Sequence, residues 1–365
     1  MRSLVGQRTA VDARLYRSDH LAEQTPAGGP PARRAQIAET GLAVDLDRFV
    51  SLEHDVEAGA ALVHRDADGT HTEATAYALD TWAPSDTWTV QPGVRLTAVE
   101  GASVWLSPRL YAERRARDGR FRVRAGVGRQ VQPVQALVPR YGGRYDDAQS
   151  GWALAGATAL DDGPAPVLSS WQAGTGVEWA PTEAIAFGVD GYARTSSGLL
   201  EAAEVPRARP VAFAPHDERA AGLEAAARLD AGPWTVGLSG AVARSEVRPE
   251  TGDAGWRAAR YDRPLSGGVL AERRTDRTTL AVRLDAESGL PRPDGSRAPA
   301  SLRAGVAAGV GVSALGAEWS ALAQIELRAR GARAPFTGTP FDAAPLVADL
   351  DGLPALPLVS LSARW

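Results

Sequence analysis

The chain has 365 residues, a formal net charge of -4, no cysteine and only arginine as its basic side chain. The lack of cysteine excludes disulfide scaffolds, thiolate metal sites and cysteine nucleophiles, and the net charge gives no reason to expect nucleic acid as a partner. No run of about 18 apolar residues is present, which excludes a transmembrane helix. The nearest candidate, residues 304–317, is short and consists mostly of glycine, alanine and valine.

Segments that alternate apolar and polar residues recur along the chain, which is typical of strands with two unlike faces. The first expected strand covers residues 10–16 and the last covers residues 356–365. In residues 121–127, Arg122 and Arg124 oppose the apolar positions. Similar alternation is found in residues 234–242, 279–285 and 319–328. The pattern predicts an all-β chain of roughly sixteen strands.

The connections between these segments differ in length. Short polar turns are expected near residues 181–183, 230–233, 274–277 and 313–317. Longer stretches are expected at residues 131–168, 201–215, 246–262 and 329–353. Bacterial outer-membrane barrels have short periplasmic turns and long outer loops. The sequence therefore predicts a transmembrane antiparallel up-and-down β-barrel in the outer membrane, with lipid around it and both termini on the periplasmic side.

Aromatic residues fall beside the short turns, where a membrane interface belt would lie. The predicted belt consists of Trp82, Trp88, Phe121, Trp179, Trp234 and Trp319. The alternative is that these residues form the core of a soluble β-sandwich. That alternative gives no reason for aromatics to gather at one end of the strands.

The last expected strand ends in an aromatic residue and carries apolar residues on one face. These residues are Val359, Leu361, Ala363 and Trp365. We interpret them as the C-terminal signal that the barrel assembly machinery recognises, although an ordinary edge strand is the simpler alternative.

Polar residues on the opposite face of the strands should line the lumen, where they stay hydrated or pair with one another. The predicted lumen-facing set is Arg122, Arg124, Glu178, Asp190, Arg194, Glu224, Arg228, Arg283, Asp285, Glu326 and Arg328. Candidate solute contacts in the outer loops are Arg140, Tyr141, Tyr145 and Trp152. The alternative for the lumen set is that it only solvates the interior.

Enzymatic chemistry is not predicted. Asp66 to Thr70 (DADGT) matches the nucleophile motif of haloacid-dehalogenase-like phosphatases, but that motif needs a buried parallel strand in an α/β fold and a Mg²⁺ between its carboxylates. Flanked by alternating strands, Asp-Gly is more typical of a hairpin turn. The five histidines show no metal-ligand spacing. We therefore expect no catalytic residues, no metal site and no cofactor.

Several stretches, taken in order, resemble the C-terminal two-thirds of the barrel in TonB-dependent outer-membrane receptors. They are residues 88–96 (WTVQPGVRL), 106–137 (LSPRLYAERRARDGRFRVRAGVGRQVQPVQAL) and 171–201 (WQAGTGVEWAPTEAIAFGVDGYARTSSGLLE), and the order continues to Pro291. The resemblance implies uptake of a scarce, bulky solute of the siderophore, cobalamin or glycan class. It also implies a barrel of about 22 strands around a plug, with TonB as a partner.

Neither a plug nor a signal peptide is recognised in the sequence, so we expect residues 1–365 to be one outer-membrane barrel domain with an N-terminal truncation. Two alternatives remain open. The first is a self-contained porin-like channel of about sixteen strands, and the second is a soluble or surface β-rich binding module. Upstream sequence would separate the receptor from the porin, and heat-modifiable migration in detergent gels would separate both from the soluble module.

Overall fold

The computed structural model describes residues 2–4, 6, 8–24, 33–66, 70–101, 103–139, 152–156, 167–202, 213–249, 255–292, 295–314, 317–328 and 355–364. None of these residues lies in a helix. Accordingly, the described ranges hold no helix with the length and apolar character needed to cross a membrane.

Within the described residues, sixteen long strands belong to one sheet, and most of them are longer than the 9–11 residues that span a bilayer. Their bounds are β2 (Thr9–Gln24), β3 (Arg33–Phe49), β4 (His54–Asp66), β5 (Thr70–Ser85), β6 (Trp88–Val99), β7 (Val104–Arg115), β8 (Phe121–Gln132), β11 (Leu168–Thr182), β12 (Ile185–Ala202), β13 (Phe213–Ala231), β14 (Trp234–Pro249), β16 (Leu265–Arg274), β17 (Thr278–Glu287), β18 (Ser301–Ala314), β19 (Ala317–Arg328) and β20 (Ala355–Arg364). The number of long strands among the described residues agrees with the roughly sixteen that the sequence predicts.

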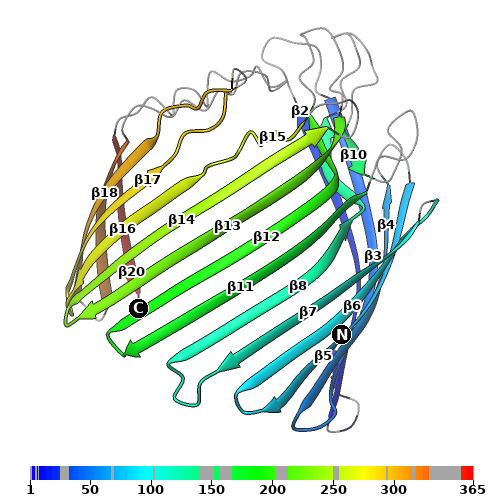
Figure 1. Ribbon diagram of the computed structural model, residues 1–365, viewed down its shortest axis with the longest axis horizontal. Coiled ribbons are helices and arrows are strands. Elements are labelled where there is room, and N and C mark those ends of the chain that lie inside the picture. Colours follow the sequence, from blue (N-terminus) through cyan, green and yellow to red (C-terminus); the bar gives the residue numbers. More distant parts are fainter. Residues whose placement is uncertain are drawn as a thin grey trace.

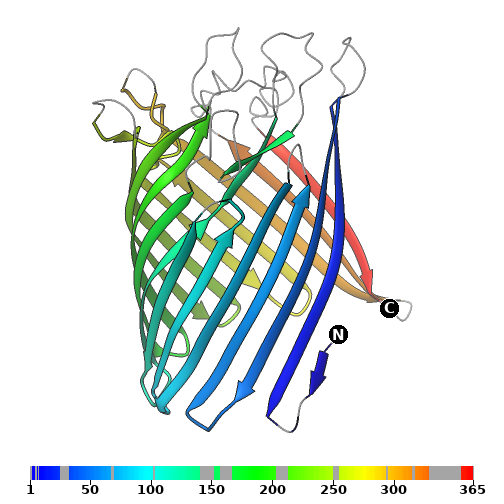
Figure 2. The ribbon, with the colours of Figure 1, turned by 90° about the vertical axis from the view of Figure 1, so that its right-hand side faces the viewer.

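The sheet is a meander in which each long strand pairs antiparallel with the strand before it and the strand after it. Two connections depart from strict order: β8 pairs with β11, and β14 pairs mainly with β16. Figures 1 and 2 show the strands running obliquely and wrapping into a curved wall, with the short turns at one end. One such turn joins β13 to β14 through Gly232, whose φ of +59° favours glycine.

Four short strands complete the topology. The strands β9 (Val134–Pro139) and β10 (Trp152–Gly156) form a separate hairpin, so residues 131–168 are not one unbroken loop as the sequence suggested. The strand β15 (Arg257–Ala258) pairs with Glu246 and Val247 on β14. β14 itself continues to Pro249, past the strand end expected near residue 246, because strands of such barrels extend beyond the hydrocarbon.

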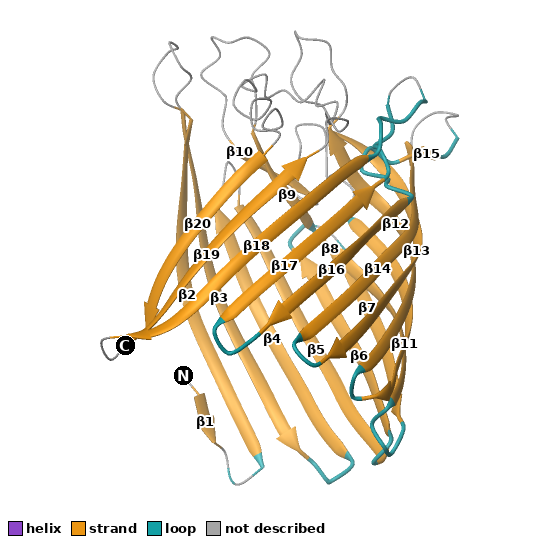
Figure 3. Cartoon of the chain, turned by 90° about the vertical axis from the view of Figure 1, so that its left-hand side faces the viewer, coloured by secondary structure: helices purple, strands orange, loops and turns teal. Residues whose placement is uncertain are grey.

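The first and last strands mark the two edges of the sheet. β1 (Arg2–Leu4) pairs with Ala10 to Asp12 of β2, and within the described residues the register otherwise pairs β2 with β3 and β20 with β19. β2 also extends to Gln24, well past the first strand expected at residues 10–16. Figure 3 shows β20 and β1 at the two edges of the sheet, near the C and N marks.

The two faces of the sheet have opposite chemical character. On one face, which we call the outer face, large apolar side chains are exposed, including Leu223 (62%), Val242 (59%) and Leu238 (52%). On the other, the inner face, side chains such as Ser170, Ser196 and Glu218 are buried. Apart from proline and glycine, the apolar residues buried within the described residues are Val99, Val247, Ala259 and Ala298. A barrel with lipid outside and a polar interior has this arrangement, whereas a soluble sandwich would bury its apolar face. The predicted fold class is confirmed.

Candidate functional site

Charged side chains on the inner face of β8, β11 and β12 form a ladder of ion pairs. Arg122 lies directly opposite Glu178 and is bonded to it. The Nη1 atom of Arg124 lies 3.2 Å from Oε1 of Glu178, and its Nη2 lies 2.7 Å from Oδ1 of Asp190. Gly176 stands between Arg124 and Asp190, and a Cβ at that position would lie 2.2 Å from Oδ1 of Asp190. The missing side chain of Gly176 therefore lets the pair form across β11.

The other residues predicted for the lumen occupy the same face. The guanidinium of Arg228 donates to Asp230 at 2.8 and 3.1 Å, and that of Arg283 donates to Asp285 at 2.7 Å. Glu224 lies opposite Asp190 in the strand register. The backbones of Glu326 and Arg328 pair with Gly305 and Arg303, but the side chains of these two residues lie outside the described residues.

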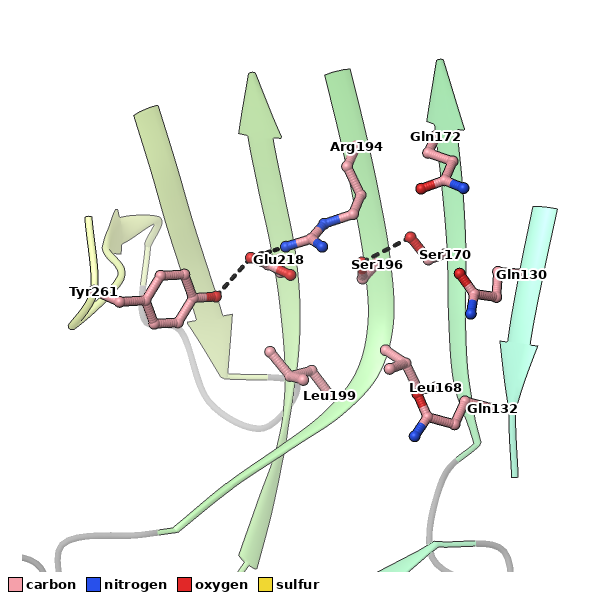
Figure 4. Close-up of a pocket in the computed structure, with 10 residues that line it drawn as sticks. All are labelled: Gln130, Gln132, Leu168, Ser170, Gln172, Arg194, Ser196, Leu199, Glu218 and Tyr261. Atoms are coloured by element: carbon pink, nitrogen blue, oxygen red, sulfur yellow. Dashed lines mark hydrogen bonds and ion pairs between the residues drawn. The ribbon is translucent and has the colours of Figure 1, made fainter. Parts of the chain in front are cut away.

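A hollow of about 420 Å³ opens on the inner face where the same strands approach the long connections (Figure 4). A second hollow of about 580 Å³ shares Gln172, Arg194 and Tyr261 with it. The first hollow is lined by Gln130, Gln132, Leu168, Ser170, Gln172, Arg194, Ser196, Leu199, Glu218 and Tyr261. Its polar lining consists of carboxamides, hydroxyls and one charge pair, which together can donate and accept hydrogen bonds from a bound molecule.

Glu218 organises this hollow. Its side chain is 4% exposed, and its Oε1 accepts hydrogen bonds from Arg194 Nη2 at 2.7 Å, Tyr261 Oη at 2.6 Å and Ser245 Oγ at 3.3 Å. A buried carboxylate requires such partners because desolvation penalises its charge. Beside it, Ser196 Oγ donates to Ser170 Oγ at 3.1 Å (Figure 4). The contacts hold β12, β13 and the β14–β16 connection in one arrangement.

Tyr261 belongs to the connection between β14 and β16 and reaches back to the wall. Burial and the Glu218 carboxylate raise the pKa of Tyr261 to about 12. The next residue, Asp262, is 3% exposed, accepts a hydrogen bond from the Ser245 backbone N–H at 2.7 Å and pairs with Arg297. Arg297 also donates to the carbonyl of Asp262 at 3.0 Å. The β14–β16 connection is therefore bonded both to the wall and to the connection between β17 and β18, which holds Arg297.

Of the residues that line the first hollow, only Arg194 was predicted from the sequence. The signal for Glu218 was present, because residues 218, 220, 222 and 224 alternate in step with the predicted Glu224. Tyr261 gave no such signal, because it lies in a connection where no period applies.

Five of the six residues predicted for the belt share the outer face at the short-turn end: Trp82, Trp88, Phe121, Trp179 and Trp234. Trp179 stacks on Phe187 with ring centroids 5.7 Å apart, and Arg114 lies 5.7 Å from the Trp88 ring centroid. The side chain of Trp319 lies outside the described residues. Their position at a membrane interface stays a prediction.

For the predicted outer-loop contacts and the C-terminal assembly signal, the described residues include backbone positions at most. Arg140, Tyr141, Tyr145 and Trp365 lie outside the described residues. Trp152 is in β10, and Val359, Leu361 and Ala363 are in β20, but their side chains are likewise not described. The contact role of the first group and the assembly role of the C-terminal residues stay predictions.

The two ends of the phosphatase-like motif, Asp66 and Thr70, lie on antiparallel strands. Asp66 pairs with Thr70 at the end of the antiparallel strands β4 and β5, so no parallel strand presents the motif. The Nδ1 atom of His64 lies 3.0 Å from Thr72 Oγ1 across the same two strands. The described residues contain no group of three side chains suited to a metal ion.

The family model described as "TonB dependent receptor-like, beta-barrel" matches residues 16–365. The chain belongs to this TonB-dependent receptor family. Barrels of the family are bacterial outer-membrane proteins, so the predicted location is confirmed. No curated protein matches the sequence.

Solved structures share the fold of this TonB-dependent receptor barrel at low sequence identity. A variant of the ferric enterobactin receptor PfeA of Pseudomonas aeruginosa is 12% identical with a TM-score of 0.62, and the match covers 89% of this chain and 54% of that one. The copper transporter OprC is 13% identical (TM-score 0.64; 87% and 55% covered). The siderophore receptor PirA of Pseudomonas aeruginosa is 13% identical (TM-score 0.61; 100% and 69% covered). The chain thus spans about half the length of the first two structures.

Proposed function

We propose that this barrel belongs to an outer-membrane receptor that takes up a scarce, bulky solute of the siderophore, cobalamin or glycan class, driven through TonB. Membership of the TonB-dependent receptor family carries the proposal. Structures that share the fold are named as ferric enterobactin, ferric citrate and copper transport proteins. A plug domain inside the barrel, TonB on the periplasmic side and the barrel assembly machinery are the proposed partners.

The inner face supports this function because it offers polar groups to both a plug and a solute. The ion-pair ladder of Arg122, Glu178, Arg124 and Asp190 lies on the wall between the short turns and the hollow. The hollow with Gln130, Gln172 and Arg194 lies nearer the long connections. We propose that the hollow contacts the solute first and that the ladder faces the plug.

We further propose that the sixteen strands are part of a closed barrel. The register pairs β2 with β3 along its length and with β1 over Ala10 to Asp12, and it pairs β20 with β19, so each strand has a second edge that a closed barrel would pair. Unpaired backbone amides in hydrocarbon cost several kcal/mol each, about as much as unsatisfied polar groups elsewhere in an apolar medium. Additional strands, or direct pairing of β2 with β20, must therefore satisfy these edges in the membrane. The domain assignment of residues 1–365 to one barrel stays part of this proposal.

The test is uptake by whole cells that carry the protein. Labelled ferric siderophores, cobalamin and oligosaccharides would be supplied in turn to cells with and without active TonB. The proposal expects accumulation of one class, abolished when TonB is removed and unchanged in a strain that lacks only an unrelated porin. Accumulation that is independent of TonB would contradict it.

A porin-like channel is the second candidate, favoured by the count of sixteen strands, a size that leaves an aqueous pore. Conductance across a planar bilayer separates the two. A porin gives a steady ohmic current after insertion, whereas a plugged receptor gives none. Heat-modifiable migration in detergent gels tests the closed-barrel proposal, because an open sheet forms no species that resists unfolding by detergent.

A further inference from the structure

Charged side chains return to the outer face at the long-connection end of β13 and β14. Arg219 on β13 lies opposite Glu246 on β14, and both share the face of Leu223 and Val242. Arg219 Nε donates to Glu246 Oε2 at 2.6 Å, and Arg244 pairs with the same carboxylate. At the next outer-face position along the two strands, Arg248 pairs with Asp217. These side chains lie outside the barrel wall and have no place in the interior already described.

Trp256 completes the group, which we call the outer arginine cluster (Arg219, Arg244, Arg248 and Trp256). The guanidinium carbon of Arg219 lies 4.4 Å from the indole centroid, and that of Arg248 lies 4.9 Å from it. Two cations on a single ring are held there by attraction to its π-electrons. The indole therefore fixes two guanidinium groups next to the third.

The charges of the cluster do not cancel. Three arginines face two carboxylates, Asp217 and Glu246, which leaves one net positive charge. The Glu246 side chain is 9% exposed, whereas those of Arg244, Arg219 and Arg248 are 77%, 49% and 45% exposed. Each guanidinium has five N–H donors in a planar fork. The carboxylates thus hold the arginines from beneath while donor groups point away from the wall.

The height of the cluster matches the outer boundary of the membrane. The outer-face column of β14 runs from Trp234, in the predicted belt, through Val236, Leu238 and Val242 to Arg244. These ten steps cover about 33 Å at about 3.3 Å per residue. With a strand tilt of about 40° the column rises about 25 Å, which is the height of the apolar band of such barrels. Arg244 therefore stands where hydrocarbon ends and headgroups begin.

We propose that the outer arginine cluster binds a phosphorylated headgroup of an outer-leaflet lipid. A forked guanidinium matches the oxygens of a phosphate in a bidentate arrangement. The acyl chains of the same lipid would lie along the apolar column of Val242, Leu223 and Leu238, which is more than half exposed. A soluble anion would use the charges alone and leave that column uncovered.

The experiment uses the purified full chain in detergent micelles and measures dissociation constants for three probes. These are diphosphorylated lipid A, the same lipid after enzymatic removal of its phosphates, and inorganic phosphate. The proposal expects the diphosphorylated lipid to bind at least about tenfold more tightly than either of the others. Equal affinity for the two lipids would overturn it. Phosphate binding as tight as the lipid would also overturn it, in favour of a free-anion site.

Variants locate the site on the wall. Arg244→Gln with Arg248→Gln should weaken binding of the diphosphorylated lipid at least about tenfold. Arg114→Gln is the matched control, because Arg114 also lies on the outer face beside an indole, that of Trp88, but at the short-turn end. Its affinity should equal that of the wild type, and an equal loss in both variants would contradict the assignment. Trp256→Leu keeps all three arginines, so it should weaken binding of the diphosphorylated lipid less than the double arginine variant does. This difference separates the role of the indole in positioning the guanidinium groups from the role of their charge. Heat-modifiable migration checks that each variant is folded.

Discussion

Both faces of β13 and β14 carry arginine and glutamate, but charged residues are placed differently along the two faces. On the inner face, the buried Glu218 of β13 accepts hydrogen bonds from Arg194 of β12 and from Tyr261 of the β14–β16 connection. On the outer face, charge is absent from Val236 to Val242 and returns only at Arg244. The surroundings, rather than the strands, decide where a charge is tolerated: the polar interior accepts a charge that is hydrated or paired, whereas the hydrocarbon excludes it until the headgroups begin.

Placing a charged residue on the outer face should reduce membrane assembly more than any other change proposed for these strands. Val282 is an outer-face residue of β17, 42% exposed, and its neighbour Arg283 lies on the inner face. Val282→Arg places a cation near the midplane at a cost of about 2–4 kcal/mol and should reduce membrane assembly. Arg283→Val should be tolerated. The yield of heat-modifiable barrel in the outer membrane measures both, and equal yields would contradict the assignment of faces.

The faces were predictable from sequence because they depend only on period two. That rule assigned Arg122, Arg124, Glu178 and Asp190 to one face, and the structure shows ion pairs among them on that face. The outer arginine cluster was not predicted, because the rule that charges face inward fails where a strand passes out of the hydrocarbon. Nor was the hollow, since its closing residue Tyr261 is brought to Glu218 by tertiary contacts that no local pattern encodes.

Removing one partner of the buried charge pair should have the next largest effect. Arg194→Met leaves Glu218 with two neutral donors in a site where it is 4% exposed, at a cost of about 1–3 kcal/mol. Arg228→Met removes a pair whose arginine is 63% exposed, and the loss should stay below about 1 kcal/mol. Urea unfolding in lipid vesicles compares the two variants. A larger loss for Arg228→Met would show that the inner face is uniformly hydrated.

The link between Tyr261 and the wall should have the smallest effect and depend on pH. Tyr261→Phe removes one hydrogen bond, worth about 1 kcal/mol. Because the folded pKa of Tyr261 is raised from 10.0 to about 12, its contribution is complete below about pH 10 and is lost as the pH rises through about 12. The difference in phenolate absorbance between wild type and variant should therefore develop only near pH 12. A difference centred at pH 10 would show that Tyr261 is not held by Glu218.

Labelling of single cysteines along β14 tests the assignment of faces most directly, because the chain has no native cysteine. Residues 236–243 would be replaced one at a time in intact cells and exposed to a water-soluble maleimide. Cysteines at the odd positions should react, those at the even positions should resist, and Arg244→Cys should react again on the outer face. Uniform reactivity, or reactivity of the even positions only, would contradict it.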